Sequence, residues 1–477
     1  MDTSSLPDAA PAASTKRETA HEATHEAADG RAPETSGPVR VGLLGIGTVG
    51  GGTFDVLRRN QDEIRRRAGR PIEIVQVADL DVERARARVG AGVAVVDDAR
   101  RLIADPDIDV VVELIGGTGI ARELVLAAIA AGKHVVTANK ALLATHGNEI
   151  FRAASQRGVI VAFEAAVAGG IPIIKALREG LTANRIEWIA GIINGTTNFI
   201  LSEMRERGLA FDAVLAEAQR LGYAEADPTF DIEGFDAAHK ITILSAIAFG
   251  VPVQFDQCHV EGITQLQAED IRYAGQLGYR IKLLGITRRR AATDDSPEGF
   301  ELRVHPTLIP ATRLIANVEG AMNAVWVKGD AVGHTMYYGQ GAGAEPTASA
   351  VVADLVDVAR MLTSDPGNRV PHLAFQAEAL SDLPVLPIEA VQTAYYLRLR
   401  VADEPGVLAD ITRILADGGV SIEAALQRAP DEGEQRTDII LLTHRTIERH
   451  IDAAIERIEA LKTVLSRAVR IRLEELD

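Results

Sequence analysis

The chain has 477 residues, of which 47% are hydrophobic and 4% aromatic, and its formal net charge is −17. This length predicts about three domains, and the acidic balance excludes sequence-independent binding to nucleic acid, which needs a basic surface. No apolar run reaches the roughly 18 residues that cross a membrane, and the single cysteine, Cys258, excludes a disulfide framework and indicates a reducing cytoplasm.

The first 38 residues are rich in Ala, Thr, Glu, Pro and Ser, and they hold almost no large apolar side chain after Leu6. Such a segment cannot bury enough surface to offset its chain entropy, so we predict a disordered tail over residues 1–38. It also lacks the apolar segment of a signal peptide.

A glycine-rich turn follows the first predicted strand, Arg40–Leu44, and leads into a helix from about Val49. In a dinucleotide-binding turn the first glycine permits the bend, the second lets the backbone approach the pyrophosphate, and the third lets the helix pack on the strand. The free N–H groups at the helix start then face the phosphates. The predicted cofactor contacts here are Gly45, Gly47, Thr48, Val49 and Gly50.

The second predicted strand, Ile72–Ala78, ends at Asp79. An acidic residue at this position binds a ribose 2′-hydroxyl and favours NAD. Three arginines follow within reach and are equally suited to a 2′-phosphate, which favours NADP, and in a third interpretation Asp79 is only a turn residue. The sequence leaves NADP or NAD open; the arginines are Arg84, Arg86 and Arg88.

Two further strands end at the same predicted sheet edge. The strand Val110–Ile115 breaks at Gly116, where we expect it to approach the cofactor, and a helix at 123–131 leads to the strand His134–Thr137. Lys140 comes just after that strand. Because ligands of parallel sheets bind at the carboxyl ends of the strands, we predict a functional role for this lysine.

The next strand ends at Glu164, within FEAAVAGGIPII. A glutamate before a glycine and proline turn, with carbonyls freed from regular pairing, is suited to a hard cation. Beyond it we expect a strand and turn over Ile189–Thr197 and helices at 199–207 and 213–221.

The chemical centre of the second domain is predicted in GYAEADPTFDIEGFDAAHK. Five carboxylates crowd an irregular loop, and an apolar helix, Phe235–Phe249, follows. Asp236 and Lys240 are spaced i, i+4 and therefore share a helix face. A lysine beside a carboxylate can hold or deliver a proton; the alternative is a solvated ion pair on an amphipathic helix. The five carboxylates are Glu225, Asp227, Asp231, Glu233 and Asp236.

From 253 to 335 we expect short helices and strands, with a loop over Arg288–Gly299. A second glycine turn and helix in Tyr338–Val351 is expected to return the chain to the cofactor. After a proline-rich linker at Leu383–Pro387, residues 394–477 have the pattern strand, helix, strand, strand, helix, strand, which is a ferredoxin-like order. The turn Asp403–Gly406 opens its first helix, whose N–H groups suit a small carboxylate.

Six segments, in order and spacing, resemble bacterial homoserine dehydrogenase with a C-terminal ACT domain, and the resemblance covers about residues 39–477. The segments are GLLGIGTVGGG, TANKALLA, EAAVAGGIPII, INGTTNFIL, GYAEADPTFDIEGFDAAHK and GQGAG.

The resemblance implies an α/β protein with three domains. They are a Rossmann nucleotide-binding domain, an α+β catalytic and dimerisation domain, and a ferredoxin-like (βαββαβ) ACT domain. The implied boundaries are 39–165, completed by 336–370, for the first; 166–335 for the second; 371–391 for a linker; and 392–477 for the third.

It also implies the site. Lys240 is the proton donor with Asp236 as its partner, Lys140 lies near the nicotinamide and substrate, and Glu225 and Asp231 bind the amino acid. Gly343 lies at the cofactor. A sodium ion is implied at Glu164 with the backbone carbonyls of Val167, Gly169 and Ile171. Threonine is implied as feedback effector of the ACT domain, at Asp403, Pro405 and Gly406.

The implied reaction is reversible, NAD(P)-dependent conversion of L-aspartate 4-semialdehyde to L-homoserine, in the biosynthesis of threonine, methionine and isoleucine, by a homodimer or homotetramer. We expect threonine to lower activity and deletion of 390–477 to abolish that effect. A rival, aspartate-semialdehyde dehydrogenase, needs an activated cysteine, which the surroundings of Cys258 do not indicate. A rival of another class is a ligand-sensing ACT protein with an inactive Rossmann scaffold.

Overall fold

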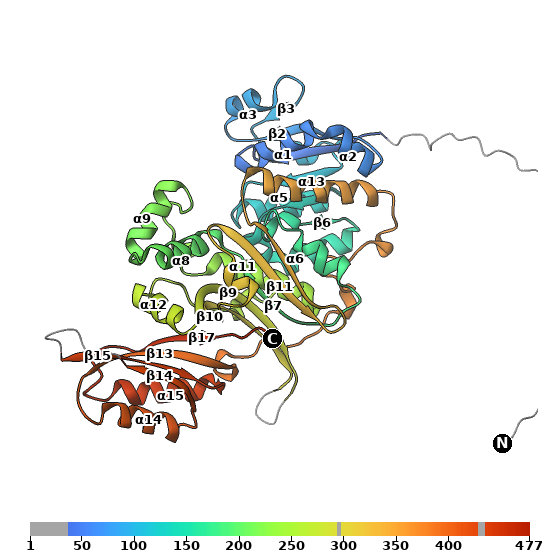
Figure 1. Cartoon of the computed structure of the whole chain (residues 1–477). Coiled ribbons are helices and arrows are strands. Elements are labelled where there is room, and N and C mark those ends of the chain that lie inside the picture. Colours follow the sequence, from blue (N-terminus) through green and yellow to red (C-terminus); the bar gives the residue numbers. More distant parts are fainter. Residues whose placement is uncertain (1–36, 293–296, 428–434) are drawn as a thin grey trace, which may run out of the picture. The chain divides into compact units, whose positions relative to one another are not determined.

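The structure is a computed structural model that describes residues 37–292, 297–427 and 435–477 (Figure 1). Of the predicted tail, only Gly37 and Pro38 are among them, so the expectation of disorder lies outside the described residues. Within these ranges, no helix combines the length and apolarity that a membrane crossing requires.

The first part of the described chain forms a parallel six-stranded sheet with the order β3-β2-β1-β4-β5-β6. The order reverses between β1 and β4, and a crevice at such a point is where open α/β sheets bind dinucleotides. The strands are β1 (Val39–Leu44), β2 (Ile72–Ala78), β3 (Ala94–Val96), β4 (Val110–Glu113), β5 (His134–Thr137) and β6 (Val161–Ala162). The helices are α1 (Thr48–Arg59), α2 (Gln61–Ala68), α3 (Val82–Val89), α4 (Ala99–Ala104), α5 (Ile120–Ala130) and α6 (Lys140–Arg157).

The helix after the second glycine turn, α13 (Ala344–Met361), lies against α1 (Figure 1). The two backbones approach so closely that a Cβ on Gly52 would lie 2.5 Å from the carbonyl oxygen of Ala344. Val351 and Leu355 of α13 share a hydrophobic core with Val41 of β1. The late segment therefore packs into the nucleotide-binding layer, as the sequence predicts.

The remaining strands form a second sheet of eleven strands, in the order β12-β11-β7-β9-β10-β17-β13-β15-β14, with β8 and β16 paired off this path. Its first half consists of β7 (Ile186–Ile192), β8 (His259–Val260), β9 (Tyr279–Arg290), β10 (Gly299–Pro310), β11 (Met322–Gly329) and β12 (Gly333–Gln340). The helices that go with it are α8 (Gly195–Arg207), α9 (Phe211–Leu221), α10 (Thr229–Ile232), α11 (Phe235–Phe249) and α12 (Ala268–Gln276).

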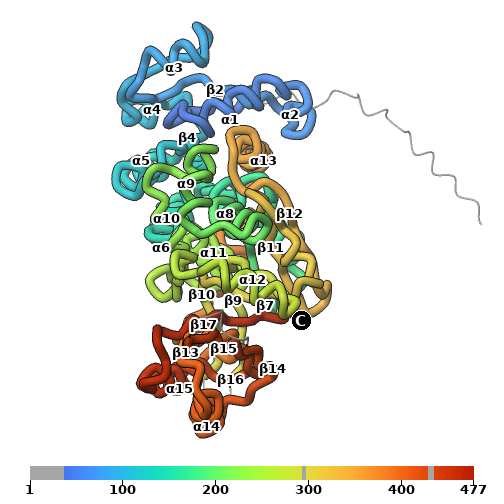
Figure 2. The backbone as a smooth tube through the Cα atoms, turned by 60° about the vertical axis from the view of Figure 1, so that its left-hand side comes forward, coloured from blue at the N-terminus to red at the C-terminus, as the bar shows by residue number. Residues whose placement is uncertain are grey.

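The C-terminal part has the predicted strand and helix order, which confirms the ferredoxin-like expectation. Its elements are β13 (Gln392–Ala402), α14 (Val407–Asp417), β14 (Ile422–Gln427), β15 (Arg436–Thr443), α15 (Glu448–Glu459) and β17 (Val469–Leu473), with the short β16 (Thr446–Ile447) before α15. Strand β17 runs antiparallel to β13 and parallel to β10, and Figure 2 shows it between these two strands. One hydrogen-bonded sheet therefore continues from the middle of the chain into its last strands.

One prediction for this region is wrong, and another is right except at its ends. Residues 253–335 contain two strands of 12 residues, β9 and β10, rather than only short elements. Residues 291–292 and 297–298 lie outside the strands, as the loop prediction expects, but β9 continues to Arg290 and β10 already begins at Gly299. The polar residues that indicate a loop are paired in the sheet: Arg290 Nε donates to Glu301 at 2.5 Å. Burying an unpaired charge costs free energy, which usually keeps such residues in loops, and pairing with an opposite charge on the neighbouring strand offsets that cost.

The predicted start of α8 is also wrong by four residues. The helix begins at Gly195 rather than at Phe199, because the side chain of Asn194 accepts a hydrogen bond from the backbone N–H of Thr197. Asparagine is one of the preferred residues at a helix N-cap. The predicted turn after β7 is therefore the first turn of a helix.

Candidate active site

Asp236 and Lys240 lie one turn apart on α11, and their side chains meet. Lys240 Nζ donates to Asp236 Oδ2 at 2.6 Å and to the backbone carbonyl of Ile193 at 2.7 Å. Every residue of α11 after Phe235 is buried, and Lys240 is only 8% exposed. The alternative of a solvated ion pair on an amphipathic helix is therefore wrong.

Lys140 reaches the same carboxylate from the nucleotide-binding sheet. It is the first residue of α6, directly after the carboxyl end of β5, and its Nζ lies 3.0 Å from Asp236 Oδ1. Its side chain keeps 33% exposure and lies over the ring of Phe230. The carboxylate of Asp236 thus binds two lysines from two different layers. Lys240 is buried, and Lys140 is open to a ligand.

The three charges shift one another's pKa. Burial opposes ionisation of Asp236, but Lys240 and Lys140 hold the pKa of its carboxyl below the ordinary value. Asp236 raises the pKa of Lys140. Burial, aided by the charge of Lys140, lowers the pKa of Lys240 although Asp236 opposes that change. Lys240 is therefore the more acidic of the two lysines, as a proton donor should be.

Lys140 is placed by a buried polar network that the sequence analysis missed. Glu113, at the end of β4, accepts the Thr137 hydroxyl at 2.6 Å and the backbone N–H of Gly116 at 3.0 Å. Asn139 is the N-cap of α6, because its Oδ1 accepts the backbone N–H of Leu142. Its Nδ2 donates to the carbonyl oxygen of Gly117 at 2.7 Å. The signal for Glu113 was available, since a charged residue ends the otherwise apolar strand VVVE.

Of the five predicted carboxylates, only some gather at the lysines. Asp231 lies in α10 rather than in a loop, and Asn194 joins it to Asp236. Glu225 is exposed, and its charge contributes to the raised pKa of Lys140. The remaining two have other partners: the Asp227 carboxylate accepts the backbone N–H of Thr229, and Glu233 accepts the Thr264 hydroxyl.

The first glycine turn has the geometry that a dinucleotide requires. Gly45 has φ +89°, which favours glycine, and a Cβ on Gly50 would lie 2.1 Å from the carbonyl oxygen of Gly45. By contrast, nothing lies within 4 Å of the corresponding position on Gly47, so the backbone is open to a phosphate there. The exposed Thr48 and the half-buried Val49 form the start of α1 and present its first N–H groups.

Asp79 is tied to this turn. Its Oδ2 accepts the backbone N–H of Ile46 at 2.8 Å, and Arg84 Nη2 lies 3.2 Å from its Oδ1. Arg88 pairs instead with Asp55 of α1. Asp79 is therefore more than a turn residue, and the exposed Arg84 is the arginine that it holds next to the glycine turn.

The two outlying glycines also lie at element ends. Gly116 follows β4, has φ +72° and is exposed. Gly343 has φ +135° and is the N-cap of α13. Both positions need a backbone that other residues rarely adopt, and the N–H of Gly116 is bonded to the carboxylate of Glu113.

Glu164 is buried at a turn, and its carboxylate is already engaged. Its two oxygens accept the backbone N–H groups of Ile174 at 2.9 Å and Lys175 at 2.8 Å, and its own N–H donates to Asp354. Burial raises the pKa of Glu164 to about 7, although these two N–H groups oppose the shift. A cation beside it would favour the ionised form. The predicted carbonyl ligands, at Val167, Gly169 and Ile171, belong to the same buried turn.

Cys258 has no feature of a nucleophile. Burial raises the pKa of its thiol to about 12, and its Sγ lies 3.7 Å from the carbonyl oxygen of His259. A catalytic cysteine needs a lowered pKa. The expected structural thiol is confirmed.

The predicted effector turn opens α14. Asp403 and Pro405 are exposed, and Gly406 is the N-cap of the helix with φ +98°. The first N–H groups of α14 therefore follow an exposed turn, as predicted.

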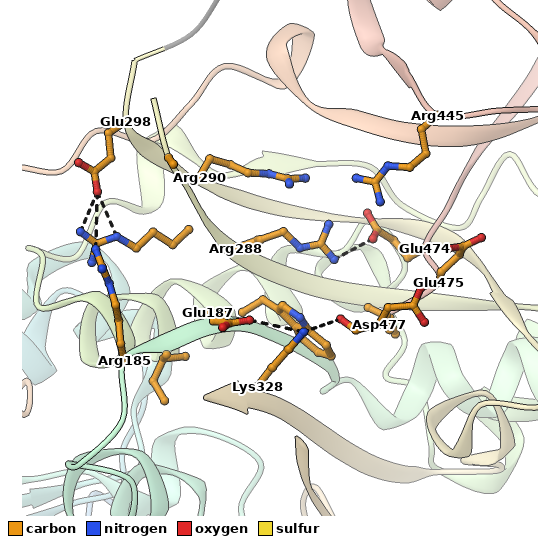
Figure 3. A pocket seen from close by; sticks show the side chains of 15 residues that line it. Arg185, Glu187, Arg288, Arg290, Glu298, Lys328, Arg445, Glu474, Glu475 and Asp477 are labelled. Atoms are coloured by element: carbon orange, nitrogen blue, oxygen red, sulfur yellow. Dashed lines mark hydrogen bonds and ion pairs between the residues drawn. The ribbon is translucent and has the colours of Figure 1, made fainter. Parts of the chain in front are cut away.

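A hollow of about 480 Å³ lies at the ends of β7 and β9, beside the C-terminus (Figure 3). Several of its charged residues pair with one another: Arg288 with Glu474 at 2.9 Å, and Lys328 with Glu187 at 3.5 Å. None of the predicted catalytic residues is among the described residues that line it. Neither Lys140 nor Lys240 lines the hollow, so it is distinct from the place where Asp236 holds these two lysines.

Comparison with known proteins matches three family models to the chain. They are the homoserine dehydrogenase NAD-binding domain over residues 45–164, homoserine dehydrogenase over 172–356, and the ACT domain over 395–463. The chain is 63% identical to the homoserine dehydrogenase of Pseudomonas aeruginosa, over 92% of this chain and 100% of the relative. It is 60% identical to that of Neisseria gonorrhoeae, over 92% and 99%.

Solved structures agree. A homoserine dehydrogenase from Thiobacillus denitrificans is 67% identical, with a TM-score of 0.87, over 92% of this chain and 99% of that one. The enzyme of S. aureus is 30% identical, with a TM-score of 0.69, over 92% and 99%.

Proposed function

The chain belongs to the homoserine dehydrogenase family, and from that premise we propose which of its residues carry out the reaction. It is an NAD(P)-dependent oxidoreductase that interconverts L-homoserine and L-aspartate 4-semialdehyde. The rival interpretation, an ACT sensor with an inactive scaffold, is not favoured by relatives of this identity.

The observation that supports the assignment best is the joint hold of Asp236 on Lys140 and Lys240. Lys240 has three N–H donors, and two are committed to Asp236 and to Ile193 O. The third is free for the oxygen of the substrate. Lys240 protonates this oxygen during reduction of the aldehyde and accepts the proton back during oxidation of homoserine. Lys140, from the cofactor side, stabilises the charge on the same oxygen.

The carboxylates of Asp231 and Glu225 bind the α-ammonium group of the substrate, because Asn194 links Asp231 to Asp236 and the charges of both acids contribute to the raised pKa of Lys140. This hold places the reacting carbon at the carboxyl edge of the parallel sheet, where NAD(P) is expected. The bound nicotinamide supplies or accepts the hydride. Homoserine-dependent reduction of NAD(P)+ by the purified chain tests the whole assignment, and no reaction with either cofactor would contradict it.

We propose that Arg84 receives the 2′-phosphate when NADP is bound. It is exposed, and its hold by Asp79 keeps it next to the glycine turn. A hyperthermophilic archaeal homoserine dehydrogenase, 24% identical, has been solved in complex with NADPH. The choice between the two cofactors then depends on the balance between this guanidinium and the Asp79 carboxylate.

Arg84→Ala is expected to lower kcat/KM for NADPH roughly 10-fold more than for NADH, because a charge-assisted bond to phosphate is lost. Steady-state kinetics with both cofactors measure this. Arg66→Ala is the control, since Arg66 is an exposed arginine on α2 whose guanidinium pairs with Glu63. Equal losses with NADPH and NADH in the Arg84 variant would contradict the role.

We also propose a sodium ion at the turn that follows Glu164. The residues present fit such a group, since a buried carboxylate whose pKa is raised gains from a neighbouring cation. Carbonyl oxygens are ligands that hard cations prefer. The ion would be held by Glu164 and the carbonyls of Val167, Gly169 and Ile171, and it would stiffen the turn that contacts Gly341 through Gly169.

The ACT domain indicates an amino acid effector, and we propose threonine, bound at the turn Asp403–Gly406. The N–H groups at the start of α14 suit its carboxylate, and Asp403 suits its ammonium group. Deleting 390–477 is a poor test, because it removes β17 from beside β10 together with the buried Glu474.

In place of that deletion, Asp403→Ala in the full chain is expected to raise the threonine concentration for half-inhibition about 10-fold, through loss of a charge-assisted bond. Its activity without threonine should equal that of the wild type. Asp410→Ala, an exposed acid one turn into α14, is the control. Unchanged inhibition in the Asp403 variant would rule out this effector site.

We further propose the domain division stated from the sequence, a homodimer or homotetramer, and a cytoplasmic location. The separate family matches support the division, and the single cysteine supports the location. The linker is more than a spacer, since the N–H of Phe300 donates to Pro384 O and the N–H of Leu386 donates back to Phe300 O.

A further inference from the structure

One neutral side chain, that of Asn194, joins the two carboxylates of the candidate site. It is buried between the end of β7 and the start of α8. Its Nδ2 donates to Asp231 Oδ1 at 2.8 Å and to Asp236 Oδ2 at 2.8 Å. A carboxamide has two N–H donors, so both of them are committed to these acids.

The orientation of this amide follows from its other contacts. Its Oδ1 accepts the backbone N–H of Thr197 at 2.8 Å and the Thr197 hydroxyl at 2.9 Å. These bonds are the N-cap of α8. If the amide were turned over, its oxygen would face two carboxylates and the helix would lose its acceptor. The NH₂ group therefore faces the acids.

The residue before Asn194 holds the proton donor directly. The carbonyl of Ile193 accepts one N–H of Lys240, and Asp236 Oδ2 accepts another N–H of Lys240 as well as one of Asn194. Two consecutive residues thus determine both acceptors that Lys240 uses. The direction of its third N–H follows from those two.

Electrostatics give the amide a second effect. Two buried carboxylates in proximity repel, and one tends to keep its proton. Burial and the charge of Asp236 raise the pKa of Asp231, and the hydrogen bond from Asn194 opposes that rise. The charged groups that act on Asp231 are Asp236 and Lys240 on α11 and Lys140 on α6. Asn194 thus favours an ionised Asp231.

We propose that Asn194 is a positioning residue, whose single amide keeps the acid that binds the substrate ammonium group in register with the lysine that protonates the substrate oxygen. The proposal rests on the proposed function, which assigns those roles to Asp231 and Lys240. Asn194 acts through the two acids and does not contact the reacting atoms.

Asn194→Asp tests this role. The substitution keeps the shape of the side chain and the cap of α8, but it replaces the NH₂ group by an oxygen of a third carboxylate. We expect kcat/KM for homoserine to fall roughly 10- to 100-fold, with a raised KM. The acid limb of the pH profile of kcat/KM should move to higher pH, because the added charge makes Asp231 harder to ionise. If Asn194 served only as the N-cap of α8, neither the homoserine KM nor the pH profile would change, since Asp and Asn cap helices equally well.

Asn198→Asp is the matched control. Asn198 is buried in the same helix turn, and its Nδ2 donates to Val318 O and Met322 O, away from the acids. We expect its homoserine KM and pH profile to match the wild type, whatever its melting temperature. Wild-type KM and pH profile in Asn194→Asp, or the same KM rise and pH shift in both variants, would overturn the proposal.

If Asn194→Asp does not fold, Asn194→Ser replaces it. Serine also caps helices but is too short to bridge the acids, so the homoserine KM should still rise about 10-fold; an unchanged KM would overturn the proposal. Failure of the proposed function has a different signature, because the wild-type chain itself would then not oxidise homoserine.

Discussion

We expect Lys240→Met to lower kcat for homoserine oxidation by about 10²–10⁴-fold, the usual contribution of a positioned proton donor or acceptor. Methionine keeps most of the volume in this buried place, and Asp236 keeps Lys140 as its partner at 3.0 Å. The variant should therefore fold and bind cofactor while lacking the group that exchanges a proton with the substrate oxygen. Stopped-assay or continuous measurement of NAD(P)H formation gives kcat directly.

Lys282→Met is the control for this result. Lys282 is also a buried lysine, and its Nζ donates to Val318 O at 2.6 Å and to Asn198 Oδ1 at 3.0 Å. Its loss is expected to lower the melting temperature and to leave kcat within about twofold, since no proposed catalytic group contacts it. A wild-type kcat in Lys240→Met would refute the assigned donor.

We expect Glu474→Gln to lower the free energy of unfolding by roughly 3–5 kcal/mol, the usual cost of removing one partner of a buried ion pair. Glu474 follows β17, and Arg303 Nη2 of β10 donates to its Oε1 at 2.5 Å, while Arg288 Nη2 of β9 donates to its Oε2 at 2.9 Å. Arg303 is only 1% exposed, so its charge would remain enclosed with less compensation.

The measurement is urea unfolding followed by tryptophan fluorescence. Both tryptophans, Trp188 on β7 and Trp326 on β11, belong to the sheet that Glu474 supports. Glu475→Gln is the control, because the neighbouring glutamate is exposed. If Glu474→Gln lowered the free energy of unfolding by less than about 1 kcal/mol, the expected contribution of the ion pairs of Glu474 to stability would be contradicted.

The same pair predicts a dependence on pH. Although burial opposes it, Arg288 and Arg303 hold the pKa of the Glu474 carboxyl below its ordinary value of 4.5. For a lowered folded-state pKa, the stabilisation is complete above pH 4.5 and declines as the pH falls from there through the folded-state value. The gap between wild type and Glu474→Gln should therefore narrow below pH 4.5.

Much of the site followed from local sequence patterns. The glycine turn after β1, the spacing of Asp236 and Lys240 on one helix face, and the position of Lys140 after β5 depend on residues close in the chain. Helix periodicity and turn chemistry act over such distances. The resemblance to a family then attached roles to those residues.

Other features could not be predicted in this way. The sequence indicates a loop over Arg288–Gly299, because arginines and glutamates usually mark exposed segments. In the sheet, Arg290 of this range pairs with Glu301 on the neighbouring strand, and Arg288 pairs with Glu474, which lies 186 residues away along the chain. A pattern of neighbouring residues cannot predict a partner as distant in the chain as Glu474.

By itself, the sequence determined the glycine turn, the order of the elements and the residue types that suit proton transfer, since each depends on backbone preferences and side-chain chemistry within a few positions. Only the tertiary structure decided that Asp236 is shared by lysines from two layers, that Asn194 links two acids, and that β17 joins β10. Those contacts form between segments far apart in the chain, and their geometry arises only when the packed layers bring those segments together.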